Sequence, residues 1–177
     1  MEKTKIFIAY AREDEVYLNR LRKYLALLER NEEVTMWYDG LIDAGTQWNE
    51  EIKKHLHSAD LIMLLVSANS LASDYFWNEE MQDALARHKR KEAIVVPVIL
   101  RHCGWASTDL QKLQALPKDG KPVTAWSDDS AAYYSIFQGI EKNVKKIQKQ
   151  KKQAASYAKP RRRVIERLLF LGLRFNF

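Results

Sequence analysis

Two adjacent carboxylates, Glu79 and Glu80, are the side chains of this sequence best placed to act on a bound ligand. They follow an aromatic run, Tyr75, Phe76 and Trp77, within a segment of helical periodicity. A carboxylate can stabilise a developing positive charge, and aromatic rings can stack on a base. The ordinary alternatives remain open, because an acidic residue in a first helical turn often complements the helix dipole and aromatic residues often pack in the core.

Helical geometry separates the roles of these two carboxylates. Adjacent residues point about a quarter of a turn apart. Met81, Ala84 and Leu85 are predicted to face inward. Glu80 lies one turn before Ala84 and therefore borders the buried face, whereas Glu79 points further toward solvent.

Other candidate groups lie in two loops. Arg12 follows a predicted strand, where it is a solvated charge or a partner for a phosphate. The simplest interpretation of Asp39–Gly40 is a turn, and the alternative interpretation is a binding loop.

Several familiar chemistries lack their motifs. Neither a dinucleotide-binding GxGxxG, a phosphate-binding GxxxxGK[ST], nor a GxSxG nucleophile elbow occurs. The four histidines and the single cysteine do not have the spacing of metal ligands, so we expect no metal. A response regulator would need an aspartate at the end of the third predicted strand, which instead ends at Val66–Ser67.

Short apolar segments alternate with segments of helical spacing. Strands are predicted at 5–10, 34–38, 61–66, 93–100 and 123–126. Helices are predicted around Leu18–Leu28, after an N-cap at Thr46, over 75–91 and from Ser130 onward. In the helix after Thr46, the residues predicted to face the core are Trp48, Ile52 and Leu56. Loops are predicted at 67–74 and 101–121. This alternation predicts an α/β fold: a flavodoxin-like, doubly wound, five-stranded parallel sheet of order 2-1-3-4-5 with helices on both faces.

The predicted strand order also locates a ligand site. In an open parallel sheet, ligands bind beyond the carboxyl ends of the strands where the order reverses, here between the first and third strands. The loops that meet there are 10–12, 67–75 and 39–46. The helix after the third strand can deliver Glu80 to the same place.

Charge is divided unevenly along the chain. The net charge is +6, but residues 145–177 hold eleven Lys and Arg against one acid, so residues 1–144 are mildly acidic. This balance argues against nucleic-acid binding by the folded part. One cysteine, Cys103, and no recognisable signal peptide favour a cytoplasmic protein.

The chain is predicted to divide into a domain at 1–147 and a basic, apolar tail at 148–177. Lys145–Lys152 continues the last helix, and Pro160 breaks it. The tail could make weak contact with an anionic membrane. A linker to a further domain, or packing against a partner or the same fold, are the alternatives.

The predicted segments resemble, in order, the boxes of the Toll/interleukin-receptor (TIR) domain family, in its bacterial stand-alone form. The run from Phe7 to Asp14 is similar to the first box, and Trp37–Asp39 with Ala44, Gly45 and Trp48 is similar to the second strand and its functional loop. The stretch from Ser67 to Tyr75, leading to Glu80 and Met81, resembles the loop and helix that carry the glutamate of the family. Pro97–Leu100 and Gly104–Trp105 complete the pattern.

The resemblance implies an enzyme that cleaves NAD+ at its nicotinamide–ribose bond, sometimes with cyclisation, in bacterial defence against viruses or in stress. NAD+ is then the substrate, with no separate cofactor, and Glu80 is the implied catalytic residue, with Glu79 as its rival. The implied binding residues are Tyr10, Ala11, Arg12, Asp39, Ala44, Gly45, Trp48, Phe76 and Trp77.

The resemblance also implies self-association through TIR–TIR contacts, with Trp105 as the candidate for a contribution across an interface. A non-enzymatic adaptor that docks through the 39–45 loop is the alternative function. Substitution of Glu80 separates the two, because only the enzyme would lose NAD+ cleavage.

Overall fold

A parallel sheet forms the centre of the computed structural model, which describes residues 2–42 and 47–158. Its strands are β1 (Thr4–Ala9), β2 (Val34–Trp37), β3 (Leu61–Val66) and β4 (Ile94–Ile99). The described sheet has the order β2-β1-β3-β4, and every pairing is parallel. Every residue of β3 is buried, as expected for a central strand that is covered on both faces. The predicted α/β class and the reversal between β1 and β3 are confirmed.

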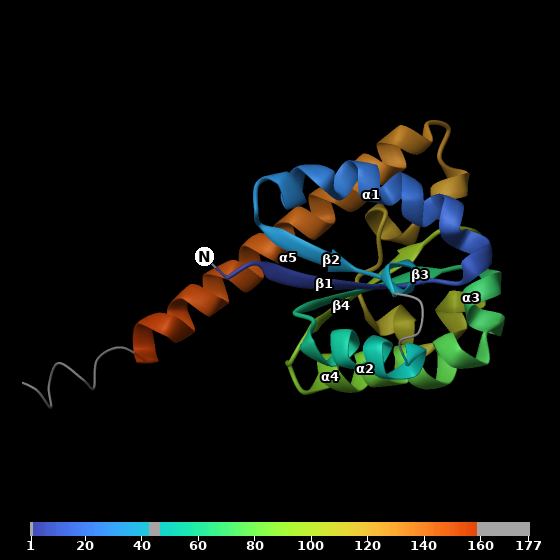
Figure 1. Cartoon of the computed structure of the whole chain (residues 1–177). Coiled ribbons are helices and arrows are strands. Elements are labelled where there is room, and N and C mark those ends of the chain that lie inside the picture. Colours follow the sequence, from blue (N-terminus) through green and yellow to red (C-terminus); the bar gives the residue numbers. More distant parts are fainter. Residues whose placement is uncertain (1, 43–46, 159–177) are drawn as a thin grey trace, which may run out of the picture.

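Helices cover both faces of the sheet (Figure 1). Helices α1 (Glu15–Arg30) and α5 (Asp129–Ala158) lie on one face, and α2 (Trp48–Ser58) and α4 (Gln82–Lys89) lie on the other. Side chains alternate along β1, so that Ile6 and Ile8 join the core beneath α1 and α5, while Phe7 and Ala9 join the core beneath α2 and α4.

The predicted fifth strand at 123–126 is wrong, because this segment forms the 3₁₀ turn η7 (Val123–Ala125). Pro122 precedes it, and the Ala125 amide donates to the Pro122 carbonyl, which closes a turn in place of a ladder. Beside β4, a single parallel bridge between Val98 and Leu116 stands at the edge of the sheet. Val123 is still buried, so its apolar side chain reflects packing in the core and not strand pairing.

The remaining turns also refine the predicted connections. The loop predicted at 67–74 contains a short helix, α3 (Ala68–Ala72), because Ser67 and Ser70 form a capping box. Short 3₁₀ turns are η1 (Arg12–Asp14), η2 (Asp39–Leu41), η4 (Gly104–Ser107), η5 (Asp109–Lys112) and η6 (Lys118–Gly120). The predicted N-cap, Thr46, lies outside the described residues, and α2 has Gln47 at its cap position.

Helix α2 is fixed to α4 by a buried arginine. Arg87 is 6% exposed, and its guanidinium donates to the Leu56 carbonyl and, over 2.9 Å, to the Ala59 carbonyl. These carbonyls lie at the end of α2, where a helix leaves acceptors without partners. The contact therefore holds the two helices that border the site.

Helix α5 continues well beyond the core. Its buried stripe ends at Ile147, after which Gln148 donates to the Glu33 carbonyl and Lys151 pairs with Asp60 at 2.7 Å. The prediction that the last helix runs on through Lys152 is confirmed, and the break predicted at Pro160 lies outside the described residues. Among the described helices, none has both the length and the apolar character that crossing a bilayer would require.

Candidate functional site

A buried polar network joins the two loops that leave β1 and β3. Asp14 is fully buried and accepts hydrogen bonds from the Ser67 hydroxyl and, over 3.3 Å, from the Asn69 amide. It therefore fixes the loop after β1 to the loop after β3 at the point where the strand order reverses. From the sequence, Asp14 was named only as the end of the run that is similar to the first box, and this role was missed.

Glu80 lies in a widened turn, the π-helix η3 (Phe76–Met81), which runs directly into α4. A π turn holds one residue more than an α turn, so Phe76 and Met81, five positions apart, both enter the core. Glu80 lies between them and is 6% exposed, whereas the Glu79 side chain is 51% exposed. The predicted difference in burial between the two glutamates is confirmed.

Burial and a second carboxylate set the electrostatics of Glu80. Burial first, and the charge of Asp39 second, raise the pKa of Glu80 to about 8. Burial followed by the charge of Glu80 raises the pKa of the Tyr75 hydroxyl to about 12, and burial with the Asp39 carboxylate raises the pKa of Tyr10. Glu80, Asp39, Tyr75 and Tyr10 therefore form one electrostatic group.

Two polar atoms of this group have no hydrogen-bond partner among the described residues. They are the Oδ1 atom of Asp39 and the hydroxyl of Tyr75, and both are buried. Most buried polar atoms in folded proteins are paired, and leaving one unpaired costs about 1–3 kcal/mol. Such atoms indicate a place where a ligand can supply the missing partner.

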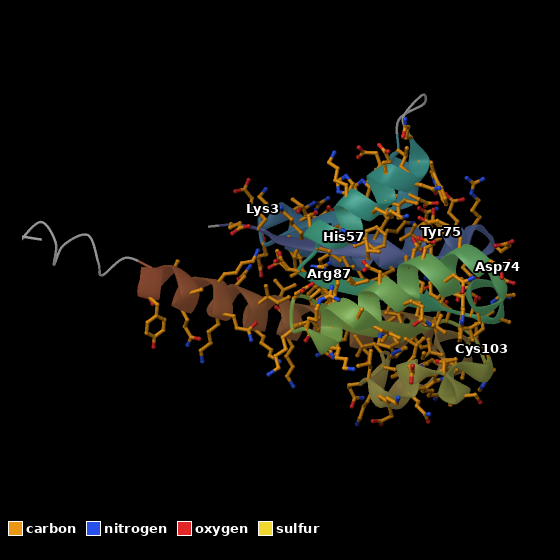
Figure 2. The ribbon with its side chains drawn as sticks, turned by 90° about the horizontal axis from the view of Figure 1, so that it is seen from below. Lys3, His57, Asp74, Tyr75, Arg87 and Cys103 are labelled. Atoms are coloured by element: carbon orange, nitrogen blue, oxygen red, sulfur yellow. The ribbon has the colours of Figure 1, made fainter. Side chains whose placement is uncertain are left out.

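A groove of 380 Å³ opens beside Glu80, between α2 and the segment formed by η3 and α4. Tyr75 and Asp83 lie on its walls together with His57, and Figure 2 shows His57 and Tyr75 on this side of the molecule. Two contacts join α2 to the other wall: Lys53 pairs with Glu79 at 3.3 Å, and the His57 Nε2 atom lies 3.2 Å from the Asp83 carboxylate, which is an ion pair only when His57 is protonated. The basic groups of the groove are thus paired with acids other than Glu80.

The aromatic residues predicted at the site separate into two groups. Trp48 was predicted to face the core, but it is 37% exposed and its ring packs against that of Tyr75 in a tilted arrangement, with centroids 4.6 Å apart. The core face of α2 is formed by Ile52 and Leu56, because Trp48 stands in its first turn. Phe76 is 1% exposed and belongs to the core, which leaves no ring face open to a ligand.

The other predicted binding residues lie around the same end of the sheet. Tyr10 is half-buried, Ala11 is buried and Arg12 is exposed at the start of η1. Trp77 is half-buried against the core beneath α2 and α4. Ala44 and Gly45 lie outside the described residues.

Trp105, the residue proposed for an interface, has an intramolecular neighbour. Its ring lies against Gly120, where an added Cβ would approach the Cζ2 atom of Trp105 to 2.9 Å. Because Gly120 has no Cβ, the ring can approach this closely. Gly120 also has a φ of +67°, a conformation that favours glycine.

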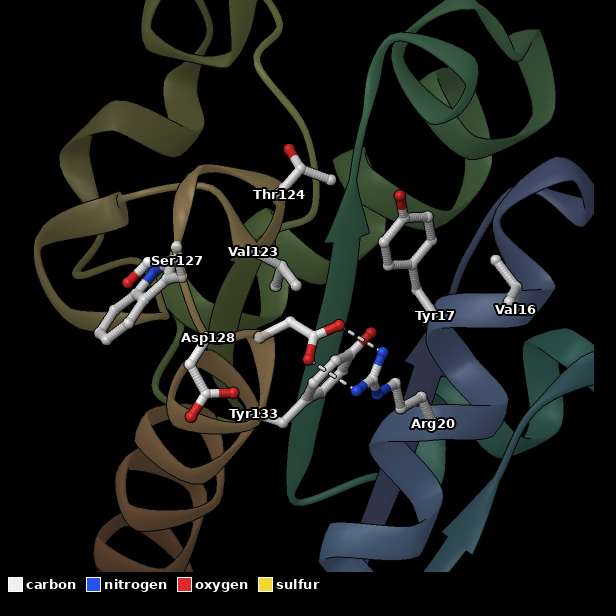
Figure 3. Close-up of a pocket in the computed structure, with 10 residues that line it drawn as sticks. Val16, Tyr17, Arg20, Val123, Thr124, Ser127, Asp128 and Tyr133 are labelled. Carbon is white, nitrogen blue, oxygen red and sulfur yellow. Dashed lines mark hydrogen bonds and ion pairs between the residues drawn. The ribbon is translucent and has the colours of Figure 1, made fainter.

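A larger cavity, of 630 Å³, lies away from these carboxylates, between α1 and the start of α5 (Figure 3). Arg20 and Asp129 cross it in a two-pronged ion pair, with one contact of 2.6 Å, and Tyr133 lies behind Arg20. The charges of Arg20 and Asp129 neutralise each other. This cavity therefore offers a ligand fewer unpaired polar groups than the Glu80 groove does.

Comparisons with known proteins agree with this geometry. A family model described as "TIR domain" matches residues 6–133. The uncharacterized protein y4lF of Sinorhizobium fredii is 41% identical over 135 residues, which are 76% of this chain. The chain spans 42% of the length of that relative.

Solved TIR domains share the fold. The RPS4 and RRS1 TIR domain heterodimer matches with a TM-score of 0.50 and 14% identity, over 80% of this chain and 97% of that one. The TIR domains of the activated Roq1 resistosome, which directly recognises the pathogen effector XopQ, match with a TM-score of 0.49 and 20% identity, over 77% of this chain and 72% of that one. From the extent of the family match, this chain belongs to the TIR domain family.

Proposed function

We propose that this TIR domain is an NAD+ nucleosidase that cleaves the nicotinamide–ribose bond, with Glu80 as its catalytic residue. The observation that carries the proposal is the placement of Glu80, a buried carboxylate that borders the groove between α2 and the segment formed by η3 and α4 and has no basic partner among the described residues. Structural ion pairs explain most buried carboxylates, and none is described for this one.

The chemistry requires only one carboxylate at the reacting carbon. Nicotinamide is a cationic ring in NAD+ and leaves as a neutral molecule, so its departure needs no general acid, in contrast to ordinary glycoside hydrolysis. Positive charge develops on the ribose as the bond breaks. An ionised Glu80 stabilises this charge and holds the ribose hydroxyls, and water then attacks the ribose carbon to give ADP-ribose and a proton.

The neighbouring residues support this placement of the substrate. Tyr75 lines the groove and Trp48 packs against it at a tilt, and Trp48 keeps part of its surface exposed for a nicotinamide or adenine ring. Tyr10 and Asp39 are the polar groups available to ribose, and Arg12 is the exposed cation available to a phosphate. In this proposal Trp48 takes the stacking role that the resemblance implied for Phe76 or Trp77.

We also propose that the domain works as an assembly of copies. Leu41, in η2, and Trp48, at the start of α2, are large apolar residues that are 47% and 37% exposed. Exposed apolar side chains favour protein contacts. The adaptor alternative would use the same surface without cleavage of NAD+.

Nicotinamide release from NAD+, measured over a series of protein concentrations, tests the proposal. An assembly-dependent enzyme releases nicotinamide faster than in proportion to protein, and sedimentation velocity shows larger species over the same range. A folded chain that self-associates and releases no nicotinamide at any concentration would favour the adaptor.

A further inference from the structure

Another groove, of 480 Å³, lies at the amino ends of β3 and β4. Asp60, directly before β3, and Ile94, the first residue of β4, both line it. The rest of its lining comes from the end of α4 with the turn that follows, and from the part of α5 around Ile147. None of its lining residues belongs to the Glu80 groove, so the two grooves are separate places on the molecule.

The two acids of this groove already have partners. Asp60 pairs with Lys151 at 2.7 Å and accepts the Lys5 amide at 2.8 Å. Glu92 accepts two hydrogen bonds from the Arg90 guanidinium, at 2.6 and 3.0 Å. Each carboxylate is therefore balanced by a cation beside it, and neither is left to neutralise the other charges of the groove.

Three lysines of the groove have no anionic partner among the described residues. Lys89 ends α4, Lys91 lies in the turn that follows, and Lys146 comes from α5. The ion pairs of this region join Lys151 to Asp60 and Arg90 to Glu92, and they include none of the three. Like charges that converge on one groove repel each other, so an anion bound between them would be favoured.

A histidine adds a directed hydrogen-bond donor to these charges. The Nδ1 atom of His88 accepts the Val95 amide at 3.2 Å, so a neutral imidazole here carries its proton on Nε2. His88 lines the groove, and no described residue accepts from its Nε2 atom. The groove thus offers an N–H donor together with three ammonium groups, a set that suits an anion with several oxygen atoms.

The size and charge of the groove narrow the class of this anion. Small-molecule sites have volumes of roughly 300–1,000 Å³, a range that includes this groove, and Ala93 and Ile147 give it a buried apolar part. A phosphate monoester carries about −1.5 to −2 charge at pH 7, so a single group falls short of three lysines. Two linked phosphate groups balance them.

We propose that this groove is a binding site for a small molecule that carries two linked phosphate groups. Lys89 and Lys91 contact the phosphate oxygens from the turn after α4, Lys146 contacts them from α5, and the His88 Nε2 atom donates to one of them. The ligand would join α5 to that turn. This inference does not rest on the proposed function, because the site uses no residue of the Glu80 groove.

Inorganic pyrophosphate is the probe for a direct test on the full chain. Isothermal titration calorimetry in metal-free buffer at about 0.15 M ionic strength, where salt screens diffuse attraction beyond about 8 Å, gives the affinity and the stoichiometry. Proton–nitrogen NMR spectra identify the residues that respond. We expect one pyrophosphate per chain, shifts at residues 88–94 and 146–151 and at the His88 Nε2 proton, and binding at least about fivefold tighter than that of orthophosphate.

Two double variants with the same net charge assign the binding to the groove. Lys91→Gln with Lys146→Gln removes one ammonium group from each side and should weaken pyrophosphate binding by at least about tenfold. Lys142→Gln with Lys149→Gln is the matched control, because both lysines are exposed on α5 outside the groove, and it should stay within about twofold of wild type. Circular dichroism checks that both variants are folded.

Several results would overturn the proposal. Equal losses in the two double variants would show that binding follows net charge and not this site. Citrate binding as tight as that of pyrophosphate would remove the preference for phosphate, and an absence of pyrophosphate binding would remove the site. Vesicles of phosphatidylglycerol and phosphatidylcholine test a membrane as the partner: vesicle binding that depends on Lys91 and Lys146, without pyrophosphate binding, would assign these lysines to a lipid surface instead.

Discussion

Glu80 should make the unfolding free energy of this domain depend on pH in a way that one substitution removes. The pKa of Glu80 is about 8 in the folded chain against 4.5 for an ordinary glutamate, so the folded state holds the proton more tightly than the unfolded state. The stabilisation is complete below pH 4.5 and is lost as the pH rises toward 8. Each unit of the difference corresponds to about 1.4 kcal/mol, so roughly 3 kcal/mol disappears between pH 5 and pH 8.

Glu80→Gln keeps the shape of the side chain and cannot ionise. The unfolding free energy of this variant should therefore gain about 3 kcal/mol over that of wild type when the pH is raised from 5 to 8. Urea denaturation at several pH values, monitored by tryptophan fluorescence, gives the unfolding free energy of both proteins. Subtracting the wild-type value from that of the variant at each pH cancels the contributions of the other titrating groups, which the two proteins share.

Glu79→Gln provides the comparison, because the exposed carboxylate of Glu79 is paired with Lys53 and should change stability by less than about 1 kcal/mol. If the advantage of Glu80→Gln over wild type were the same at pH 5 and pH 8, the buried, proton-retaining state of Glu80 would be refuted.

Three further predictions follow from particular contacts. Arg87→Ala leaves the carbonyls at the end of α2 without their donors and should lower the unfolding free energy by about 3 kcal/mol in urea titrations, whereas no loss would show that α2 does not depend on this contact. Tyr75→Phe removes a hydroxyl that has no described partner, so stability should change by less than about 1 kcal/mol while KM for NAD+ rises severalfold in steady-state assays; an unchanged KM would remove the hydroxyl from the site. Truncation after Ile147 removes only the contacts of Gln148 and Lys151 from the described part of the domain, so the product should stay soluble with a cooperative melt, and precipitation on expression would contradict this.

The sequence predicted the structure best where a pattern of apolar residues directly reflects their burial. The apolar run of β3 can be accommodated only as a strand covered on both faces, and it is fully buried. The inward side chains after it also placed Glu80 at the edge of the core and Glu79 outside it, as the structure confirms.

The errors arose where tertiary contacts decided between similar local patterns. Val123 is apolar and buried in either a strand or a turn, and the turn follows from Pro122. Trp48 has the spacing of a core residue, yet in the first turn of α2 it packs at a tilt against Tyr75 instead.

The electrostatic group of the site lay beyond what sequence patterns report. Asp39 and Glu80 are distant in the chain, and the charge of Asp39 acts on Glu80 only in the folded chain. The π turn that seats Glu80 has no signature in the local spacing, because Phe76, Glu80 and Ala84 also follow ordinary helical periodicity. Only the folded arrangement shows that the charge of Asp39 helps to raise the pKa of Glu80.

The most direct test of the central claim is a side-by-side measurement of nicotinamide release from NAD+ by wild type, Glu80→Gln and Glu79→Gln at one protein concentration high enough for self-association. The account predicts that Glu80→Gln loses nicotinamide release by at least about a hundredfold while remaining folded and assembled, and that Glu79→Gln stays within a few-fold of wild type. Equal release by wild type and Glu80→Gln, or a loss confined to Glu79→Gln, would contradict it.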